Sequence, residues 1–286
     1  MSQILQENDY PQMRTLPTQA VREIVRAGDY RGHTAGLAAG RLQANVVILP
    51  EGHAVDFMRF CQRNAKACPL VGVSDRASPM LHTLGSDIDI RTDVPSYRIY
   101  RHGVAEEEVT DIRDLWRDDL VAFALGCSFT FERALMDDGI RLQHIDRNFT
   151  VPMFKTSIPT EPAGPFSGGV VVSMRPIARA DVERATSISA RYPFAHGAPV
   201  HIGNPEAIGI VSLDQPDWGD ACAIGEDEVP VFWACGVTPQ NAVLNAKPEI
   251  CITHTPGCML ITDIDENQEV PVYNAAGRQA QPGSNS

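Results

Sequence analysis

The sequence predicts an α/β fold with a mainly parallel sheet and a smaller inserted α+β domain. Residues 44–49 are a continuous apolar run, typical of a strand covered on both faces. A helix is expected at about 53–67, and a second buried strand follows at 70–73. The stretch 229–262 repeats this order of strand, helix and strand, whereas residues 148–199 mix short β runs with one helix. Alternation of strands and helices is the signature of the α/β class.

The stretch 229–262 gives the clearest indication of a strand, a helix and a second strand. An apolar, β-favouring run occupies residues 229–235. Thr238 is a natural N-cap, and Pro239 follows at the first helical position, where its missing N–H costs nothing. Pro248 closes the helix, and residues 250–253 form a second β run. We expect the two strands to be parallel, with a ligand at their connecting turns.

A broken helix is predicted between Asp111 and Gly139. Four apolar residues recur at helical spacing in its first half: Trp116, Leu120, Phe123 and Ala124. Gly126, Cys127 and Ser128 interrupt the pattern, and helix character resumes at Phe129. Backbone N–H groups at the start of the second half would form an anion-binding corner beside a thiol, a hydroxyl and the Glu132 carboxylate.

Two domains and two terminal segments are expected. The main α/β domain is discontinuous and takes residues 18–147 and 200–264, with the α+β domain inserted at 148–199. Residues 1–17 read as an N-terminal arm. Residues 265–286 are polar and are expected to be a mobile tail.

Composition narrows the class of partner. The chain has 286 residues, of which 43% are hydrophobic and 21% charged, so wholesale disorder is excluded. A net charge of −12 argues against a nucleic-acid or anionic-membrane surface and favours a small-molecule partner. No apolar run approaches the roughly 20 residues of a membrane span, so a cytoplasmic protein is expected. The oligomeric state stays open, a homo-oligomer included.

Seven cysteines lie mostly within apolar runs, and no C-x-x-C pair occurs. Buried thiols are therefore expected rather than a disulfide framework. Cys127 or Cys235 beside a histidine could instead be an activated nucleophile.

Four clusters of polar or reactive residues fall where elements are expected to end. They are residues 126–129 with Glu132, residues 173–176, residues 196–201, and residues 235–238 with 254–257. Element ends are where α/β proteins usually bind ligands.

Each cluster also allows a plain structural interpretation. His196, His201 and His254 could bind a divalent metal, but a proline-containing loop does not present two ligands as a helix would, so no cofactor is expected. Arg175 could clamp a carboxylate in bidentate fashion or form an ordinary ion pair. Glu132 could simply interact with its own helix N-terminus.

At these clusters the sequence resembles a known family. The segments GCSFTFE, VVSMRPI, HGAPVHIG, VPVFWACGVTPQ and ITHTPGCMLITD are similar to those of a bacterial hydro-lyase family, as are NVVILP, DFMRFCQRN and DIRTDVPSYRIYR. That family is similar to the D-glutamate cyclase domain of animal mitochondria. The resemblance covers about residues 18–264. Cys258 departs from it, since a histidine is more usual after this Pro-Gly pair.

The resemblance implies a three-layer α/β domain with a smaller two-layer α+β domain, and a reaction that removes water. Cyclisation of D-glutamate to 5-oxoproline would need a base, an acid, oxyanion donors and a cationic clamp for the carboxylate. We expect His254 or His196 as the base and Glu132 as the acid. Arg175 would be the clamp, and N–H groups near Cys127 and Ser128 or Gly236 the oxyanion donors.

These roles, and the further expectations that follow, rest on residue type and position alone. Thr238 and His201 are expected to help bind the substrate. A covalent variant would use Cys127 or Cys235 through a thioester. A dehydratase for a hydroxy acid, metal-dependent through the three histidines, is an alternative reaction. A non-catalytic binding protein for a small carboxylate is a further alternative.

Overall fold

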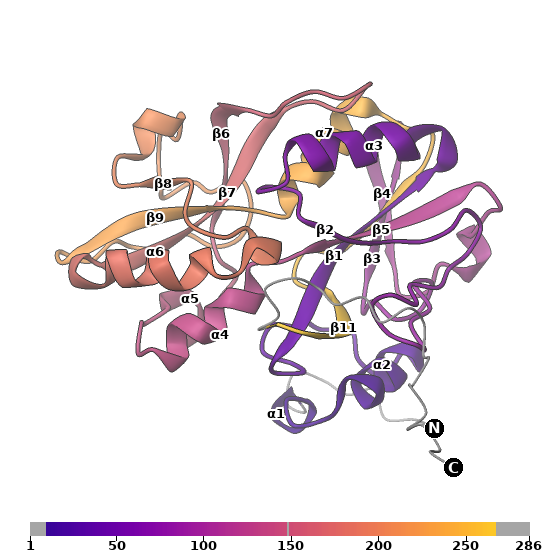
Figure 1. Cartoon of the computed structure of the whole chain (residues 1–286), viewed down its shortest axis with the longest axis horizontal. Helices are drawn as coiled ribbons and strands as arrows, with labels where there is room; N and C mark the ends of the chain where they lie inside the picture. The colour runs from indigo at the N-terminus through magenta and orange to yellow at the C-terminus, as the bar shows by residue number, and fades with distance from the viewer. Residues whose placement is uncertain (1–9, 148, 267–286) are drawn as a thin grey trace, which may run out of the picture.

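The computed structural model describes residues 10–147 and 149–266, which form two β-sheets with helices packed against them (Figure 1). The mixed α/β class is confirmed. The predicted parallel sheet is wrong, because every pair of neighbouring strands in the described residues runs antiparallel.

The larger sheet has seven strands in the order β2-β5-β1-β10-β3-β4, with β11 also paired to β1. Their bounds are β1 Arg41–Pro50, β2 Leu70–Val73, β3 Tyr97–Arg101, β4 Val104–Val109, β5 Leu120–Gly126, β10 Cys251–His254 and β11 Leu260–Asp265. Strands β1 and β2 do share a direction, as predicted for a strand, helix and strand unit. Strand β5 lies between them and is antiparallel to both, which is why no parallel pair forms.

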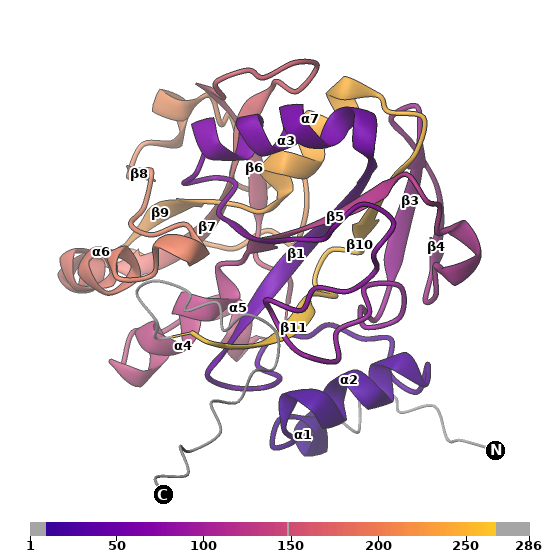
Figure 2. The same ribbon diagram turned by 45° about the vertical axis from the view of Figure 1, so that its right-hand side comes forward.

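Both faces of β1 are covered, which explains its continuous apolar run. Val47 and Leu49 face helices α3 (Glu51–Arg63) and α7 (Val237–Ala246), which lie side by side over the sheet (Figures 1 and 2). The alternate residues Val46 and Ile48 pack on the opposite face, against apolar side chains from the long connection between β2 and β3. Strand β1 is therefore central to two hydrophobic clusters.

The smaller sheet has the order β6-β7-β9-β8. Its bounds are β6 Met153–Pro159, β7 Gly169–Ala178, β8 His201–Ile202 and β9 Glu228–Ala234. Helices α4 (Phe129–Asp137) and α6 (Val182–Ala190) contribute to the hydrophobic cluster on one of its faces. Because β8 and β9 lie beyond residue 199, strand pairing extends past the predicted insertion at 148–199. The domain boundaries themselves stay a prediction.

The stretch 229–262 joins the two sheets. Strand β9 belongs to the smaller sheet and β10 to the larger one, with α7 between them. The predicted elements are present, but the expected parallel pairing of the two strands is wrong. The chain crosses from one sheet to the other through α7, so the ends of β9 and α7 lie at the boundary between the sheets.

The predicted broken helix is wrong in its first half. Residues Arg113–Leu115 form one short 3₁₀ turn, and residues Leu120–Gly126 are strand β5. All seven residues of β5 are buried, and the strand lies between β1 and β2. Because its side chains are apolar on both faces, the sequence shows no alternation, and some of its apolar residues fall at helical spacing by chance. The second half is confirmed, because helix α4 begins at Phe129.

The N-terminal helices pack across the end of the larger sheet. Helix α1 spans Tyr10–Met13, and α2 spans Thr18–Arg26. Met13 is 1% exposed, so this part of the predicted arm is packed rather than loose. Arg22 of α2 is buried and pairs with Asp87 and Asp263. The predicted tail lies almost wholly outside the described residues.

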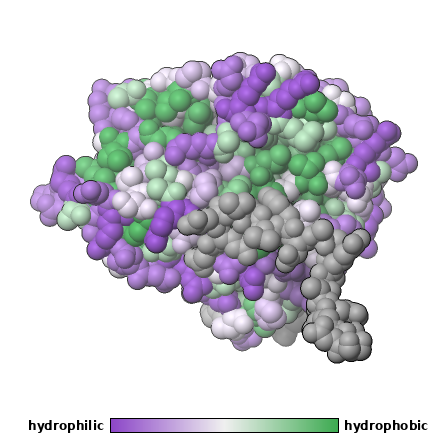
Figure 3. All heavy atoms as spheres, viewed as in Figure 1, coloured by the Kyte–Doolittle hydropathy of each residue, from purple (hydrophilic) through white to green (hydrophobic). Residues whose placement is uncertain are grey.

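The remaining helix, α5, spans Gln143–Asp146. On the face of the molecule seen in Figure 3, apolar groups show in separate areas among hydrophilic ones. In the described ranges, no helix has the length and apolar character needed to cross a membrane.

Phe57 tests the packing of α3 on the larger sheet. Its fully buried ring contacts Phe123 and Phe166, with ring centroids 4.9 and 5.2 Å away. We expect Phe57→Ala to lower the free energy of unfolding by about 3–5 kcal/mol, because it leaves a cavity between helix and sheet. Urea denaturation measures the change. Met58→Ala, at a side chain 36% exposed, is the control and should cost about 1 kcal/mol or less; equal losses would contradict this packing.

Candidate active site

Two junctions between a strand and a helix lie against each other where the two sheets meet. One connects β5 to α4 at residues 126–128, and the other connects β9 to α7 at residues 235–236. Asn45 of β1 links them: its Nδ2 donates to the Gly126 carbonyl oxygen at 2.9 Å, and its amide also fills the space beside Gly236. A Cβ at Gly236 would lie 2.2 Å from that nitrogen, so the junction needs glycine there.

A third segment reaches the same place. The carbonyl oxygen of Phe194 approaches Gly126 so closely that an added Cβ would lie 1.6 Å from it. Residues 193–195 form a 3₁₀ turn that ends at His196, whose φ of 75° is left-handed. Glycine at 126 therefore lets the turn that carries His196 pack directly on the end of β5. The clusters predicted around residues 126–132, 173–176, 196 and 235–238 do come together.

A buried ion pair lies beneath these junctions. Arg175 of β7 and Glu132 of α4 form it, with Arg175 Nε donating to Glu132 Oε1 at 3.0 Å and Nη2 donating to the same oxygen. His144 of α5 also contacts that oxygen, from Nε2 at 3.0 Å. Arg175 Nη1 and Nη2 donate to the hydroxyls of Ser173 and Ser128 at 3.0 and 3.1 Å.

Packing places Arg175 for this role. Alternation along β7 turns Arg175 toward the face that α4 and α6 cover, opposite to Met174. Its guanidinium lies between the rings of Phe131 and Trp233, with centroids 5.3 and 5.4 Å from Cζ. The side chain is fully buried, and cation–π contacts add to its stabilisation.

The charge state of Glu132 follows from its partners. Burial raises the pKa of this carboxyl, but the charges and hydrogen bonds of His144 and Arg175 outweigh burial and lower the pKa to about 2. Glu132 is therefore ionised at neutral pH, which does not suit the expected role of acid. Arg175, with all three of its nitrogens engaged, is not free to clamp a substrate. Both residues fit a positioning role in this arrangement.

His196 presents a free lone pair. Its Nδ1 lies 3.0 Å from the Lys66 carbonyl oxygen, which can only accept, so the neutral ring carries its proton on Nδ1. Nε2 is buried and finds no hydrogen-bond partner in the described part of the chain. Burial, together with the charges of Arg175 and Lys66, lowers the His196 pKa to about 4 against the effect of the hydrogen bond to the Lys66 carbonyl. His196 is thus placed to accept a proton.

His254 has the opposite tautomer. The backbone N–H of Val46 donates to its Nδ1 at 3.0 Å, closer than the Val46 carbonyl oxygen at 3.4 Å, so the shorter contact places the proton of the neutral ring on Nε2. Gln240 of α7 also approaches Nδ1, at 3.4 Å. Burial and the charge of Arg98 lower the pKa of His254 to about 4, against the effect of a hydrogen bond to the Val46 backbone carbonyl. A neutral His254 therefore offers an N–H donor rather than a basic lone pair.

The two junction cysteines are protonated thiols at neutral pH. Burial raises the pKa of Cys127 to about 12 and also raises that of Cys235, although each lies at the start of a helix. The N–H of Phe129 reaches the first thiol and that of Val237 the second. Since the thiolate is the nucleophile, this arrangement favours the direct reaction over the covalent variant.

His201 and Thr238, which were expected to bind the substrate, make hydrogen bonds to other parts of the chain. His201 donates from Nε2 to the Asn204 carbonyl at 2.7 Å and packs near the ring of Phe232. The Thr238 hydroxyl bonds both the N–H and the carbonyl of Val171, so it ties α7 to β7. The helix N-cap is Gly236, not Thr238. Among the residues that can be described, no three His, Cys, Asp or Glu side chains are grouped to hold a metal ion.

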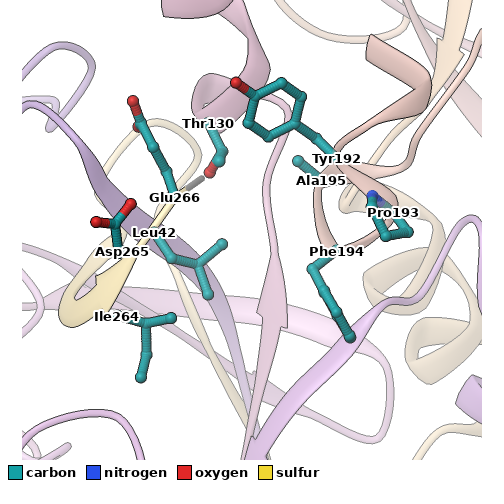
Figure 4. A pocket seen from close by; sticks show the side chains of 9 residues that line it. All are labelled: Leu42, Thr130, Tyr192, Pro193, Phe194, Ala195, Ile264, Asp265 and Glu266. Atoms are coloured by element: carbon teal, nitrogen blue, oxygen red, sulfur yellow. The ribbon is translucent and has the colours of Figure 1, made fainter. Parts of the chain in front are cut away.

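A narrow hollow borders the segment that carries His196 (Figure 4). Thr130, in the first turn of α4, lines it with residues 192–195 and the end of β11. Its volume of about 10 Å³ holds about one water molecule. Burial raises the pKa of Glu266, on its wall, to about 7. The hollow is a place for solvent beside the site, not for an amino acid.

His144 was not predicted from the sequence. It lies 12 residues after Glu132 in a separate short helix, and neither hydrophobic periodicity nor a motif marks it. Asn45 was not predicted either, because it lies within the apolar run of β1. The clustering of polar residues at element ends did give Glu132, Arg175, His196 and His254.

Comparison with known proteins agrees with the resemblance described above. A family model described as D-glutamate cyclase matches residues 121–263, half of the chain. A "Putative hydro-lyase" from Jannaschia sp. is 60% identical over 261 residues, covering 91% of this chain and 98% of that protein. One of the same name from Dinoroseobacter shibae is 59% identical, covering 92% and 88%.

A solved structure gives a much weaker likeness. It is a nitrogen repressor-like protein from Methanococcus jannaschii, 11% identical, and the match covers 82% of this chain and 91% of that one. Its TM-score of 0.37 is too low to carry an argument.

The buried ion pair makes a prediction about stability and pH. Glu132→Gln leaves the Arg175 charge buried without its counter-charge, so we expect a loss of about 3–5 kcal/mol in the free energy of unfolding at pH 7. Because folding lowers the Glu132 pKa, its contribution is complete above the ordinary pKa of 4.5 and is lost as the pH falls toward 2.

The gap between wild type and variant should therefore narrow from pH 4.5 to pH 2 in urea denaturation. The double variant Glu132→Gln with Arg175→Met is the control, and it should lose less than the sum of the single changes. A gap that stays constant with pH would contradict the ion pair.

Proposed function

Since the chain belongs to the D-glutamate cyclase family, we propose that it cyclises D-glutamate, or a closely related amino acid, to 5-oxoproline with loss of water. The family placement supports a lyase that removes water. The observation that carries the proposal is the pair of buried neutral histidines of opposite tautomer, one accepting and one donating, beside the junctions where two helices begin.

The reaction has a simple proton balance. The α-nitrogen attacks the γ-carboxyl carbon, a C–N bond forms, and one C–O bond of that carboxyl breaks. The ammonium loses two protons on the way to the lactam N–H, and the departing oxygen gains two to leave as water. A single group that accepts protons from nitrogen and returns them to oxygen therefore serves as base and then as acid.

His196 fits this shuttle. Its Nε2 lone pair is unpaired among the described residues, and its Nδ1–H is held by the Lys66 carbonyl, which fixes the ring. A pKa near 4 makes it a weak base but a ready acid once protonated, so the proton passes on to the leaving oxygen. The predicted separate acid, Glu132, is then not needed.

His254 supplies the complementary function. Its Nε2–H can stabilise negative charge on the attacked carboxyl, as a neutral imidazole does when its other nitrogen accepts a backbone hydrogen bond. Helix α7, whose Gln240 approaches His254, begins at the β9 junction with its positive dipole end. The ion pair of Arg175 and Glu132 fixes the junctions that carry these groups.

A second reaction deserves the same assay. The name of the relatives, hydro-lyase, favours elimination of water from a hydroxy acid, and the same accepting and donating histidines could serve it. The substrate panel that follows separates the two reactions.

The test is turnover by the purified chain. We expect interconversion of D-glutamate and 5-oxoproline, followed by NMR, with L-glutamate and a panel of hydroxy acids as comparisons. His196→Gln should lower the rate by about 10²–10⁴-fold while the protein stays folded. His82→Gln, at an exposed histidine, is the control and should keep full activity. Turnover of a hydroxy acid alone would overturn the cyclase proposal, and full activity of His196→Gln would remove this residue from the mechanism.

A further inference from the structure

The proposed reaction needs a cation that pairs with the α-carboxylate of the substrate. The substrate keeps its α-carboxylate throughout ring closure, and burying that charge without a partner would be costly. Arg175 was the expected clamp, but Glu132, Ser173 and Ser128 engage all of its nitrogens and it is fully buried. Another cation must therefore face the substrate.

Lys66 lies beside the proposed base. It follows α3 and precedes β2, and its carbonyl oxygen accepts the Nδ1–H of His196 at 3.0 Å. Its side chain reaches the same segment, because a Cβ built on Gly197 would lie 3.8 Å from Lys66 Nζ. The charge of this ammonium is felt at His196. The backbone of Lys66 thus bonds the base, and its ammonium lies near Gly197, the next residue along the chain.

The Lys66 ammonium has no acidic partner within the described residues. Partial burial lowers its pKa, and no carboxylate acts to raise it. Lys155, by contrast, lies 3.7 Å from Asp217 and over the ring of Trp218. In a chain of net charge −12, a lysine that is exposed but unpaired at the rim of a candidate site is available for an anion from outside.

We propose that the Lys66 ammonium binds the α-carboxylate of the substrate. The inference rests on the proposed function and names its specificity residue. The α-carbon of an amino acid carries the amine and the carboxylate together, so the group that accepts the amine proton and the group that holds the carboxylate must be neighbours. His196 and Lys66 meet that condition. Lys66 also lies outside residues 121–263, the range that the family model matches.

The test measures charge recognition without turnover. The probes are 5-oxo-D-proline, which has one carboxylate, and its carboxamide, which has the same ring without the charge. Calorimetry gives the dissociation constants of both for wild type, Lys66→Met, Lys66→Arg and the control Lys155→Met. The substitutions keep the Lys66 backbone carbonyl, so the bond to His196 remains.

We expect wild type to prefer the carboxylate over the carboxamide by at least about tenfold, as a charge-assisted hydrogen bond allows. Lys66→Met should lose that preference by weakening only the carboxylate, Lys66→Arg should retain most of it, and Lys155→Met should equal wild type. In turnover, Lys66→Met should raise KM for D-glutamate more than it lowers kcat.

The outcomes separate the two proposals. An unchanged preference in Lys66→Met, or no binding of either probe by wild type, overturns the role of Lys66. Loss of preference in Lys66→Met supports that role even when D-glutamate is not turned over, in which case the cyclase proposal alone fails. Turnover with an unchanged KM in Lys66→Met leaves the cyclase proposal standing and rejects Lys66.

Discussion

The ion pair of Arg175 and Glu132 is the constraint on which the rest of the site depends. Arg175 belongs to the smaller sheet, whereas Glu132 belongs to the helix that continues directly from β5 of the larger sheet. Holding two charges in the interior requires further polar partners, and Ser128, Ser173 and His144 supply them. The pair therefore fixes how the two sheets meet, and with them the two junctions.

Close backbone approach then determines where the histidines lie. Gly126 admits the turn before His196, and Gly236 admits the amide of Asn45, so neither junction tolerates a larger side chain without movement. Each histidine is oriented by a backbone group, a carbonyl for His196 and an N–H for His254. Because a carbonyl only accepts and an N–H only donates, the backbone imposes opposite tautomers on two rings of the same chemical type.

Local structure could be predicted well from the sequence, whereas the pairing of distant strands could not. Apolar runs predicted β1, β2 and β9, and the start of α4 followed from the Gly126 break. At β5 the same kind of apolar run led to the wrong prediction of a helix. A strand buried on both faces lacks the alternation of apolar and polar residues that would distinguish it from a helix. The prediction of parallel pairing failed because β5 lies between β1 and β2, and because β9 and β10 belong to different sheets.

The site shows the same division. Clustering of polar residues at element ends found Arg175, Glu132 and both histidines. Their roles depend on contacts between residues that are far apart in the sequence. Arg175 and Glu132 are 43 residues apart, and His254 and Val46 are 208 residues apart, so no local pattern encodes these contacts. Glu132, expected as the acid, and Arg175, expected as the clamp, contact each other as an ion pair, which the sequence did not indicate.

The most direct measurement of this account is the tautomer of each buried histidine, read from the ¹⁵N chemical shifts of its ring nitrogens at neutral pH. The account predicts a proton on Nδ1 of His196 and on Nε2 of His254, with both rings neutral down to about pH 5 because burial lowers each pKa to about 4. The same tautomer in both rings, or titration of either near pH 6.5, would contradict it.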